Sequence, residues 1–157
     1  MRPDQPAPAA AINGGTAAGC HHVQHCGGNR QDPFRGPAVH PRLAVRTPAK
    51  GEAAKTEIRQ KHPHASLEVR HIDLADLSTV RVFAQSLHDD GRPLDLLLNN
   101  AGVMAPPKRM TTADNFELQF GSNFLGPFAL TNLLLPLLLT AERPRVATMS
   151  STAAGIG

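Results

Sequence analysis

The stretch that decides the fold reads Leu94-Asp95-Leu96-Leu97-Leu98-Asn99-Asn100-Ala101-Gly102. Its first five residues form a nearly continuous apolar run, which is typical of a strand buried on both faces of a parallel sheet. The Asn-Asn-Ala-Gly that follows breaks the run with residues that tolerate positive φ, and taken alone it could be only a turn. We therefore expect a buried strand whose carboxyl end is polar.

Upstream of this strand, the pattern alternates between helix and strand. Thr47 can cap a helix with Pro48 at its first position, after a short strand end at 43–45. Ser66–Asp73 alternates as a strand. The next segment has apolar residues at i, i+3, i+4 and i+7, the spacing of one helical face: Val80, Phe83, Ala84 and Leu87.

Downstream, a long helical pattern covers residues 114–139, and Arg145–Met149 predicts another buried strand. Strand and helix patterns thus alternate from residue 43 to the end of the sequence. This order predicts the α/β class, as a three-layer sandwich with helices on both faces of a parallel sheet.

The composition changes sharply near Leu43. Residues 1–42 hold six of the 14 prolines and almost no large apolar residues. So little apolar surface cannot offset the conformational entropy of the chain, and disorder is expected there. The abruptness of the change suggests a second explanation, an out-of-frame translation whose correct frame resumes near Leu43. The predicted organisation is a disordered or out-of-frame segment at 1–42 and a folded domain at 43–157.

The totals exclude several classes of protein. The net charge of +3 comes from scattered Arg and Lys, so a nucleic-acid partner is not expected. The richest apolar run, Leu130–Leu139, is too short to span a bilayer and is interrupted by Asn132 and Pro136. Two cysteines do not make a disulfide framework, and no signal peptide is recognisable. We expect a cytoplasmic protein without a membrane span.

Polar residues follow each predicted strand: Arg46, Asp73, Asn100 and Ser150-Ser151. Ligands of an open parallel sheet bind outside the carboxyl ends of its strands, so these residues are candidates for one site. Each also has a plainer interpretation. Asp73 could be a loop or helix cap, Arg46 a solvated surface charge, and a serine pair after a strand is common.

Taken together, these segments resemble the short-chain dehydrogenase/reductase family, and within it the retinol-dehydrogenase-like branch. Five segments carry the resemblance, in order and at suitable spacing: 44–52, 73–77, 94–104, 120–126 and 146–151. The resemblance implies a partial Rossmann-type domain that binds a nicotinamide cofactor. It also implies an oxidoreductase that transfers hydride between this cofactor and a small-molecule alcohol or carbonyl.

The resemblance also assigns roles to individual positions. The implied cofactor-binding residues are Arg46, Lys50, Asp73, Leu74, Asn100, Ala101 and Gly102. Of these, Asp73 and Leu74 are expected at the adenine, and Asn100–Gly102 at the ribose. Arg46, assisted by Lys50, is expected at a 2′-phosphate, which favours NADP as the cofactor and leaves NAD possible.

Two implied positions are catalytic. Asn123 matches the helix asparagine that holds a water in the proton relay, and Ser151 matches the serine that hydrogen-bonds the reacting oxygen. The helix at 114–139 is often a subunit contact in this family, which implies a homo-oligomer, although a core helix is the alternative.

Three departures from the family pattern bear on activity. No glycine-rich turn precedes Arg46 at a suitable distance, so no phosphate-binding helix start is expected there. The sequence contains no tyrosine, and tyrosine is the general acid of the family. Pro127 replaces a histidine of the branch and should kink the long helix. We therefore expect this chain alone to be inactive.

Two alternatives remain open. The chain could be a non-catalytic remnant or an interaction module built on a partial Rossmann sheet. Separately, Cys20-His21-His22 with His25-Cys26 has soft ligands at close spacing, which makes a metal-binding amino-terminal module conceivable. Zinc sites usually draw ligands from two separated clusters, and only one is present, so no metal ligands are assigned.

Overall fold

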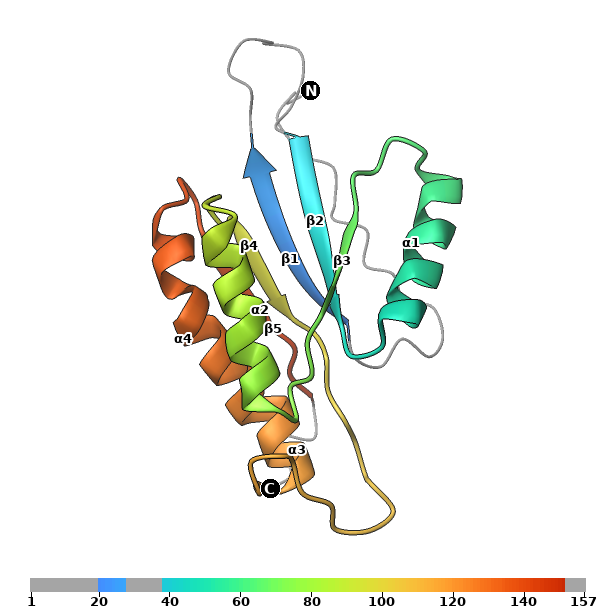
Figure 1. Cartoon of the computed structure of the whole chain (residues 1–157), viewed down its shortest axis with the longest axis vertical. Helices are drawn as coiled ribbons and strands as arrows, with labels where there is room; N and C mark the ends of the chain where they lie inside the picture. Colours follow the sequence, from blue (N-terminus) through green and yellow to red (C-terminus); the bar gives the residue numbers. More distant parts are fainter. Residues whose placement is uncertain (1–19, 28–37, 152–157) are drawn as a thin grey trace.

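The computed structural model describes residues 20–27 and 38–151. They form a five-stranded sheet with the order β3-β2-β1-β4-β5 (Figure 1). The strands are β1 (Cys20–Gly27), β2 (Ala38–Val45), β3 (Glu68–His71), β4 (Leu96–Asn99) and β5 (Arg145–Thr148). This strand order is that of the first five strands of a Rossmann sheet, so the predicted fold class is confirmed.

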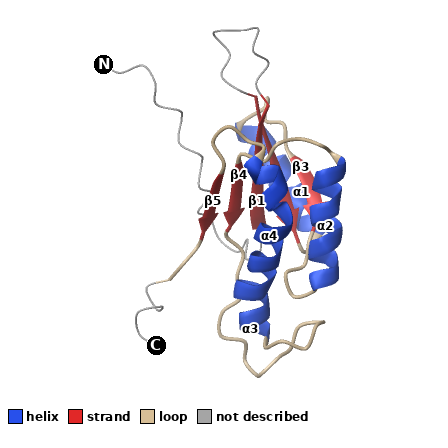
Figure 2. Cartoon of the chain, turned by 90° about the vertical axis from the view of Figure 1, so that its left-hand side faces the viewer, coloured by secondary structure: helices blue, strands red, loops and turns tan. Residues whose placement is uncertain are grey.

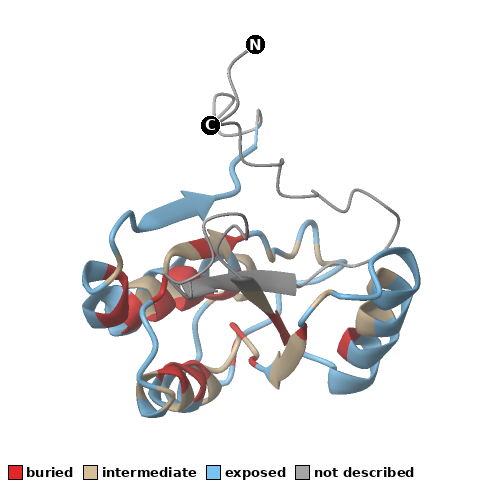
Figure 3. Cartoon of the chain, turned by 90° about the horizontal axis from the view of Figure 1, so that it is seen from above, coloured by how far each residue is buried: buried red, intermediate tan, exposed pale blue. Residues whose placement is uncertain are grey.

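Helices cover the two faces of the sheet and make three layers (Figures 2 and 3). They are α1 (Pro48–Lys61), α2 (Leu77–Asp89), α3 (Leu118–Phe120), η1 (Gly121–Leu125) and α4 (Gly126–Leu139). The helix α1 lies on one face, and α2 and α4 pack together on the other. The turn η1 is π-helical and joins α3 to α4 in one continuous helix.

The central strand runs against its neighbours. The pairs β2–β3 and β4–β5 are parallel, as expected, whereas β1 is antiparallel to both β2 and β4. Only residues 28–37 separate β1 from β2. A hairpin can be closed by so short a connection, but a parallel crossover takes a dozen or more residues. The carboxyl end of β1 therefore lies at the opposite edge of the sheet from those of the other four strands.

The structure differs from the predicted disorder of residues 1–42 in two places. Residues 20–27 form β1, and residues 38–42 belong to β2. The rest of that segment, residues 1–19 and 28–37, lies outside the described residues, and the out-of-frame hypothesis stays a prediction.

The core lies between the sheet and the pair α2–α4. The four residues predicted from helical spacing, Val80, Phe83, Ala84 and Leu87, are all buried there. They pack with Leu94 and Leu97 around β4 and with the α4 residues Leu130 and Leu134, all of which are fully buried. Burying a side chain such as Leu or Phe contributes about 1.5–3 kcal/mol, so this cluster stabilises the described domain.

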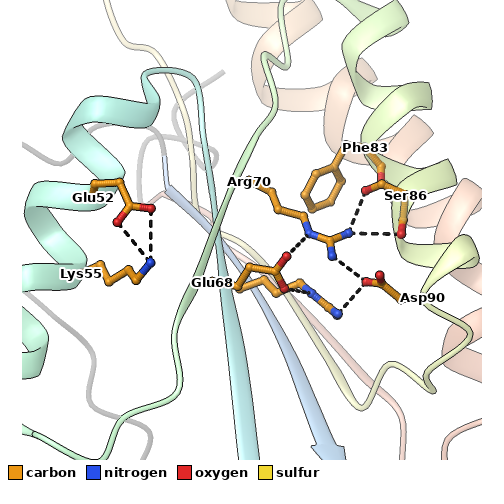
Figure 4. A network of polar contacts seen from close by, with 8 residues as sticks. Glu52, Lys55, Glu68, Arg70, Phe83, Ser86 and Asp90 are labelled. Atoms are coloured by element: carbon orange, nitrogen blue, oxygen red, sulfur yellow. Dashed lines mark hydrogen bonds and ion pairs between the residues drawn. The ribbon is translucent and has the colours of Figure 1, made fainter.

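A network of ion pairs joins β2, β3 and α2 (Figure 4). The buried Arg42 contacts Glu68 at 2.9 Å and Asp90 at 2.6 Å, and Arg70 contacts the same two carboxylates at 2.7 and 2.8 Å. Although partial burial alone would raise it, the pKa of Glu68 is lowered by the hydrogen bonds and charges of Arg70 and Arg42. A cavity of about 450 Å³ adjoins this network, and no predicted site residue lines it.

The strand β5 is exposed, and the prediction that it is buried was wrong. All four of its residues are exposed, and Val146 retains 44% of its accessible surface (Figure 3). The apolar pattern of β5 is that of a central strand, but β5 is an edge of the described sheet. An edge strand lacks a neighbour on one side, so the sequence pattern alone overestimates its burial.

Candidate functional site

The residues predicted at strand ends lie along one edge of the sheet, the edge formed by the carboxyl ends of the parallel strands. Because β2 and β4 are both antiparallel to β1, they are parallel to each other, and the carboxyl ends of β2, β3, β4 and β5 share this edge. Val45 O accepts a hydrogen bond from Ile72 N at 3.0 Å, and Asn99 O accepts one from Met149 N at 2.9 Å. Arg46, Asp73, Asn100 and Ser150 therefore follow neighbouring strand ends.

Arg46 and Lys50 place positive charge at the start of α1. Both residues are exposed. Pro48 occupies the start of the helix as predicted, but the Thr47 side chain makes no capping hydrogen bond. The first turn contains no acidic residue, so its positive dipole end is not compensated locally. Such a helix start, flanked by two cations, is suited to bind a phosphate group.

Asp73 forms a tight turn that begins after β3. Its Oδ1 accepts a hydrogen bond from Ala75 N at 2.9 Å, and its N–H donates to Thr79 Oγ1 at 2.9 Å. The Leu74 side chain is buried in the core, so only its main chain is available to a ligand. Thr79 was not identified from the sequence, because the capping-box pattern has Glu or Gln, not a hydroxyl residue, three positions after the cap.

Asn100 and Gly102 are exposed at the end of β4, and Ala101 is half-buried. The residue before them, Asn99, is buried and was not assigned a role from the sequence. Its Nδ2 donates to Thr131 Oγ1 at 3.2 Å and to Thr148 Oγ1 at 3.4 Å, which ties β4 to α4 and β5. Its Oδ1 has no hydrogen-bond partner. No spacing rule distinguishes Asn99 from Asn100 in the sequence.

Asn123 lies in the π-turn η1 and holds the loop that follows β4. Its Oδ1 accepts from Val103 N at 2.8 Å, and its Nδ2 donates to Val103 O at 2.8 Å. A Cβ on Gly102 would lie 3.3 Å from Asn123 Oδ1, so glycine lets the loop approach closely. Gln119 acts similarly two residues along the loop, since its Oε1 accepts from Ala105 N at 3.0 Å. The site edge is thus fixed to the long helix.

The sequence predicted a kink of the long helix at Pro127. In the structure, the helix 118–139 is distorted before this residue, by a π-turn. The π-turn Gly121–Leu125 precedes Pro127, which is buried in the first turn of α4. Because η1 runs directly into α4, an N–H at residue 127 would have a carbonyl partner in the preceding turn, and the proline removes that hydrogen bond. The distortion is therefore a change from π-helical to α-helical hydrogen bonding, between Leu125 at the end of η1 and Gly126 at the start of α4.

Ser151 follows β5 at the same edge and is exposed. Arg46, Asp73, Asn100–Gly102, Asn123 and Ser151 consequently all border on the carboxyl ends of the parallel strands. Among the described residues, the central strand β1 places no candidate residue after its carboxyl end at this edge. The carboxyl end of β1, at Gly27, lies at the far edge, and no helix start lies beneath the central position.

Comparisons with known proteins agree with this geometry. The family model described as short chain dehydrogenase matches residues 39–157. The chain belongs to the short-chain dehydrogenase family. Members of this family are oxidoreductases that use NAD or NADP as their cofactor.

Among curated relatives of this short-chain dehydrogenase, human retinol dehydrogenase 13 is 45% identical over 111 residues, or 71% of this chain and 33% of its own length. Polyprenol dehydrogenase of Danio rerio is 43% identical over 117 residues, covering 72% and 36%. The chain thus spans about a third of the length of the curated relatives it matches.

Solved structures show the same fold. An uncharacterised protein from Mycobacterium paratuberculosis is 48% identical, with a TM-score of 0.57 over 71% of this chain and 37% of that one. A short-chain dehydrogenase of Escherichia coli CFT073, solved as a complex with NADPH, has a TM-score of 0.62 at 23% identity. It covers 74% of this chain and 50% of its own, and at this identity it supports the fold alone.

The prediction of a purely cytoplasmic short-chain dehydrogenase was wrong. The names of its relatives specify retinol and polyprenol, isoprenoid alcohols that partition into lipid. The expectation that no segment spans a membrane stays a prediction. Within the described ranges, one helix, Leu118–Leu139, has the length and apolar composition for this, because α3, η1 and α4 are continuous. The core helix of a soluble protein passes the same test, and α4 packs on α2.

The cluster from Cys20 to Cys26 lies in β1, and its side chains are outside the described residues. The metal-binding alternative therefore stays a prediction. Among the residues with described side chains, no group of three or more His, Cys, Asp or Glu could hold a metal ion.

Proposed function

We propose that this short-chain dehydrogenase chain binds the adenosine 2′-phosphate half of NADP at the edge formed by β2, β3 and β4. The observation that carries the proposal is the pair of exposed cations, Arg46 and Lys50, at the uncompensated start of α1. A phosphate there would accept hydrogen bonds from the guanidinium and the ammonium. Asp73 and the Asn100–Gly102 loop would border the adenine and the ribose.

The chain offers less to the other half of the cofactor. A pyrophosphate needs backbone N–H groups at a helix start under the central strand, and the reversed β1 provides none among the described residues. When bound, the nicotinamide would supply or accept a hydride. The chain's own part at that end is to donate a hydrogen bond from Ser151 to a carbonyl oxygen and to hold the loop through Asn123.

The proposed substrate of the whole enzyme is an alcohol or carbonyl compound, and the relatives' names support a lipid-soluble isoprenoid. This chain contains no tyrosine, so it has no phenolic proton donor for the reacting oxygen. We propose that the 157-residue chain binds nucleotide without turnover. Purified chain should oxidise no NADPH in the presence of retinal above the rate without protein, and retinal-dependent oxidation would contradict this proposal.

The binding proposal is tested with adenosine 2′,5′-bisphosphate and adenosine 5′-monophosphate as probes, by calorimetric titration. A hydrogen bond to a charged group contributes about 1.5–3 kcal/mol, so Arg46→Ala should weaken the bisphosphate about tenfold or more. The monophosphate, which lacks the 2′-phosphate, should change little. Arg59→Ala, in the last turn of α1, is the matched control and should leave both affinities unchanged. Equal weakening of both probes by Arg46→Ala would refute the assignment.

A second role, as an interaction module, is favoured by the outer face of the long helix. Phe120, Phe124 and Phe128 stack there, with ring centroids 5.3 and 6.0 Å apart, and more than half of each residue's surface is exposed. We propose that a second copy of the chain covers this face. Sedimentation equilibrium should show a dimer that Phe124→Gln dissociates, and a monomeric unmodified chain at all concentrations would exclude it.

A further inference from the structure

The three methionines that the structure describes differ widely in exposure. Met104 keeps 91% of its accessible surface, Met149 keeps 64% and Met110 keeps 42%. Met104 lies in the loop after β4, two residues beyond Gly102 of the candidate site. Its thioether is therefore the most accessible one among the described residues, and it lies at the site edge.

The main chain on both sides of Met104 is bound to the long helix. Asn123 Oδ1 accepts a hydrogen bond from the N–H of Val103, and Asn123 Nδ2 donates one to the Val103 C=O, each at 2.8 Å. Gln119 Oε1 accepts one from the N–H of Ala105 at 3.0 Å. These three bonds, the clamp, hold the residues before and after Met104, so its exposure is a property of a fixed loop.

Ala105 contributes to the outward position of Met104. Its φ of +47° lies in the left-handed region, which is uncommon for a residue with a Cβ. Such a conformation persists only where the surrounding contacts hold it, and the bond to Gln119 is such a contact. The turn directly after Met104 therefore depends on the clamp, and loosening the clamp should release it.

A thioether exposed in this way reacts directly with peroxides. A sulfur lone pair attacks one peroxide oxygen, so an S–O bond forms while the O–O bond breaks. The sulfur is oxidised by two electrons, and the peroxide is reduced to water or an alcohol, which takes the proton of the transferred oxygen. The product, methionine sulfoxide, is polar, and methionine sulfoxide reductases return it to the thioether.

We propose that Met104 is a site of reversible oxidation by peroxides, and that the clamp selects it by holding its side chain outward. On the loop side, the clamp uses only main-chain atoms of Val103 and Ala105, so the sulfoxide forms without breaking these bonds. Oxidation exchanges an apolar for a polar side chain close to Gly102. This inference goes beyond the proposed function and does not rest on nucleotide binding.

The first test measures oxidation site by site in the whole chain. Trypsin, which does not cleave before proline, separates the three methionines into the peptides 82–108, 110–145 and 146–157. After limited treatment with hydrogen peroxide, mass spectrometry should show Met104 oxidised fastest, about twofold faster than Met110, in line with their exposed fractions. In concentrated urea the three rates should converge. A folded chain in which Met149 or Met110 reacts first, or rates that keep the same ratios in urea, would overturn the proposal.

The second test loosens the clamp. Gln119→Ala removes the acceptor of the Ala105 N–H, and Ala105→Val disfavours the left-handed turn from the loop side. Both variants should lower the ratio of the Met104 rate to the Met149 rate, since a released side chain can pack against the surface. Gln85→Ala is the matched control, because it removes the side-chain bond of an exposed glutamine on α2 and should leave the ratio unchanged. An unchanged ratio in both clamp variants would show that the clamp does not select Met104.

The third test separates a reversible modification from damage. Chain oxidised at Met104 and Met104→Leu chain treated in the same way should unfold at the same urea concentration. Methionine sulfoxide reductases A and B should restore the original mass of the folded chain. A lower unfolding midpoint in the oxidised chain, or a sulfoxide that both reductases leave in place, would contradict the proposal. A failure of adenosine 2′,5′-bisphosphate binding would refute the proposed function and leave these outcomes unchanged.

Discussion

The side-chain amide of Asn123 is joined to the main-chain N–H and C=O of Val103 by two hydrogen bonds, each 2.8 Å long. Asparagine is the smallest residue that can both donate and accept in this way. The two bonds fix the loop after β4 to the π-turn, and with it the exposed Asn100 and Gly102. The position of the loop after β4 therefore depends on a residue of the long helix.

Asn123→Ala removes both bonds and should lower the free energy of unfolding by about 1–3 kcal/mol, since each bond contributes about 0.5–1.5 kcal/mol. Urea unfolding measures the change, and amide exchange at Val103 should accelerate. The control is Asn132→Ala, on the same helix, where one bond to Phe128 O is lost. Unaltered protection of the Val103 amide in Asn123→Ala would show that the contact does not hold the loop.

Gly126→Ala should also destabilise the chain. A Cβ at this position would lie 2.7 Å from Leu74 O and 2.9 Å from Leu74 Cβ, and neither atom can move without shifting the turn at Asp73. Overpacking of this kind costs about 1–3 kcal/mol. Chemical denaturation should show that loss for Gly126→Ala. A variant as stable as the unmodified chain would mean that α4 and the Asp73 turn are not in close contact.

Stability should depend on pH through Glu68. Its pKa in the folded chain lies below its ordinary value of 4.5, despite partial burial, because of Arg70 and Arg42. Its stabilising contribution is therefore complete above pH 4.5 and is lost as the pH falls through the folded pKa. Glu68→Gln should reduce the loss of stability on acidification below pH 4.5. Glu57→Gln, which removes the exposed pair with Lys61, should not. Identical acid profiles for all three chains would exclude the mechanism.

Periodicity predicted those parts of the fold that local pattern determines. The apolar face of α2 and the proline start of α1 follow from spacing and backbone chemistry, and both are present. The exposure of β5 could not be predicted in this way, because an apolar strand has the same sequence pattern at the edge and in the centre of a sheet. The reversal of β1 depends on the length of its connection to β2 and on its pairing with β4, in which Leu97 lies 74 residues after its partner Val23.

The sequence predicted the candidate site residues that directly follow strand ends. It missed the residues that support these positions through side-chain hydrogen bonds. Arg46, Asp73 and Asn100 follow strand ends that the sequence reveals. Asn99 and Thr79 act through hydrogen bonds that depend on the packing of α4 and on the turn after β3. The spacing of residues in the sequence does not predict such contacts, so these two residues could be identified only from the structure.

We propose that this short-chain dehydrogenase chain binds the adenosine side of NADP, and that among the described residues the reversed β1 offers no helix start to the pyrophosphate. The most direct test is the ratio of two dissociation constants, measured by calorimetry on the same preparation, for NADP⁺ and for adenosine 2′,5′-bisphosphate. The two constants should agree within about threefold, a difference of less than about 0.7 kcal/mol. Binding of NADP⁺ tenfold or more tightly than the bisphosphate would contradict it.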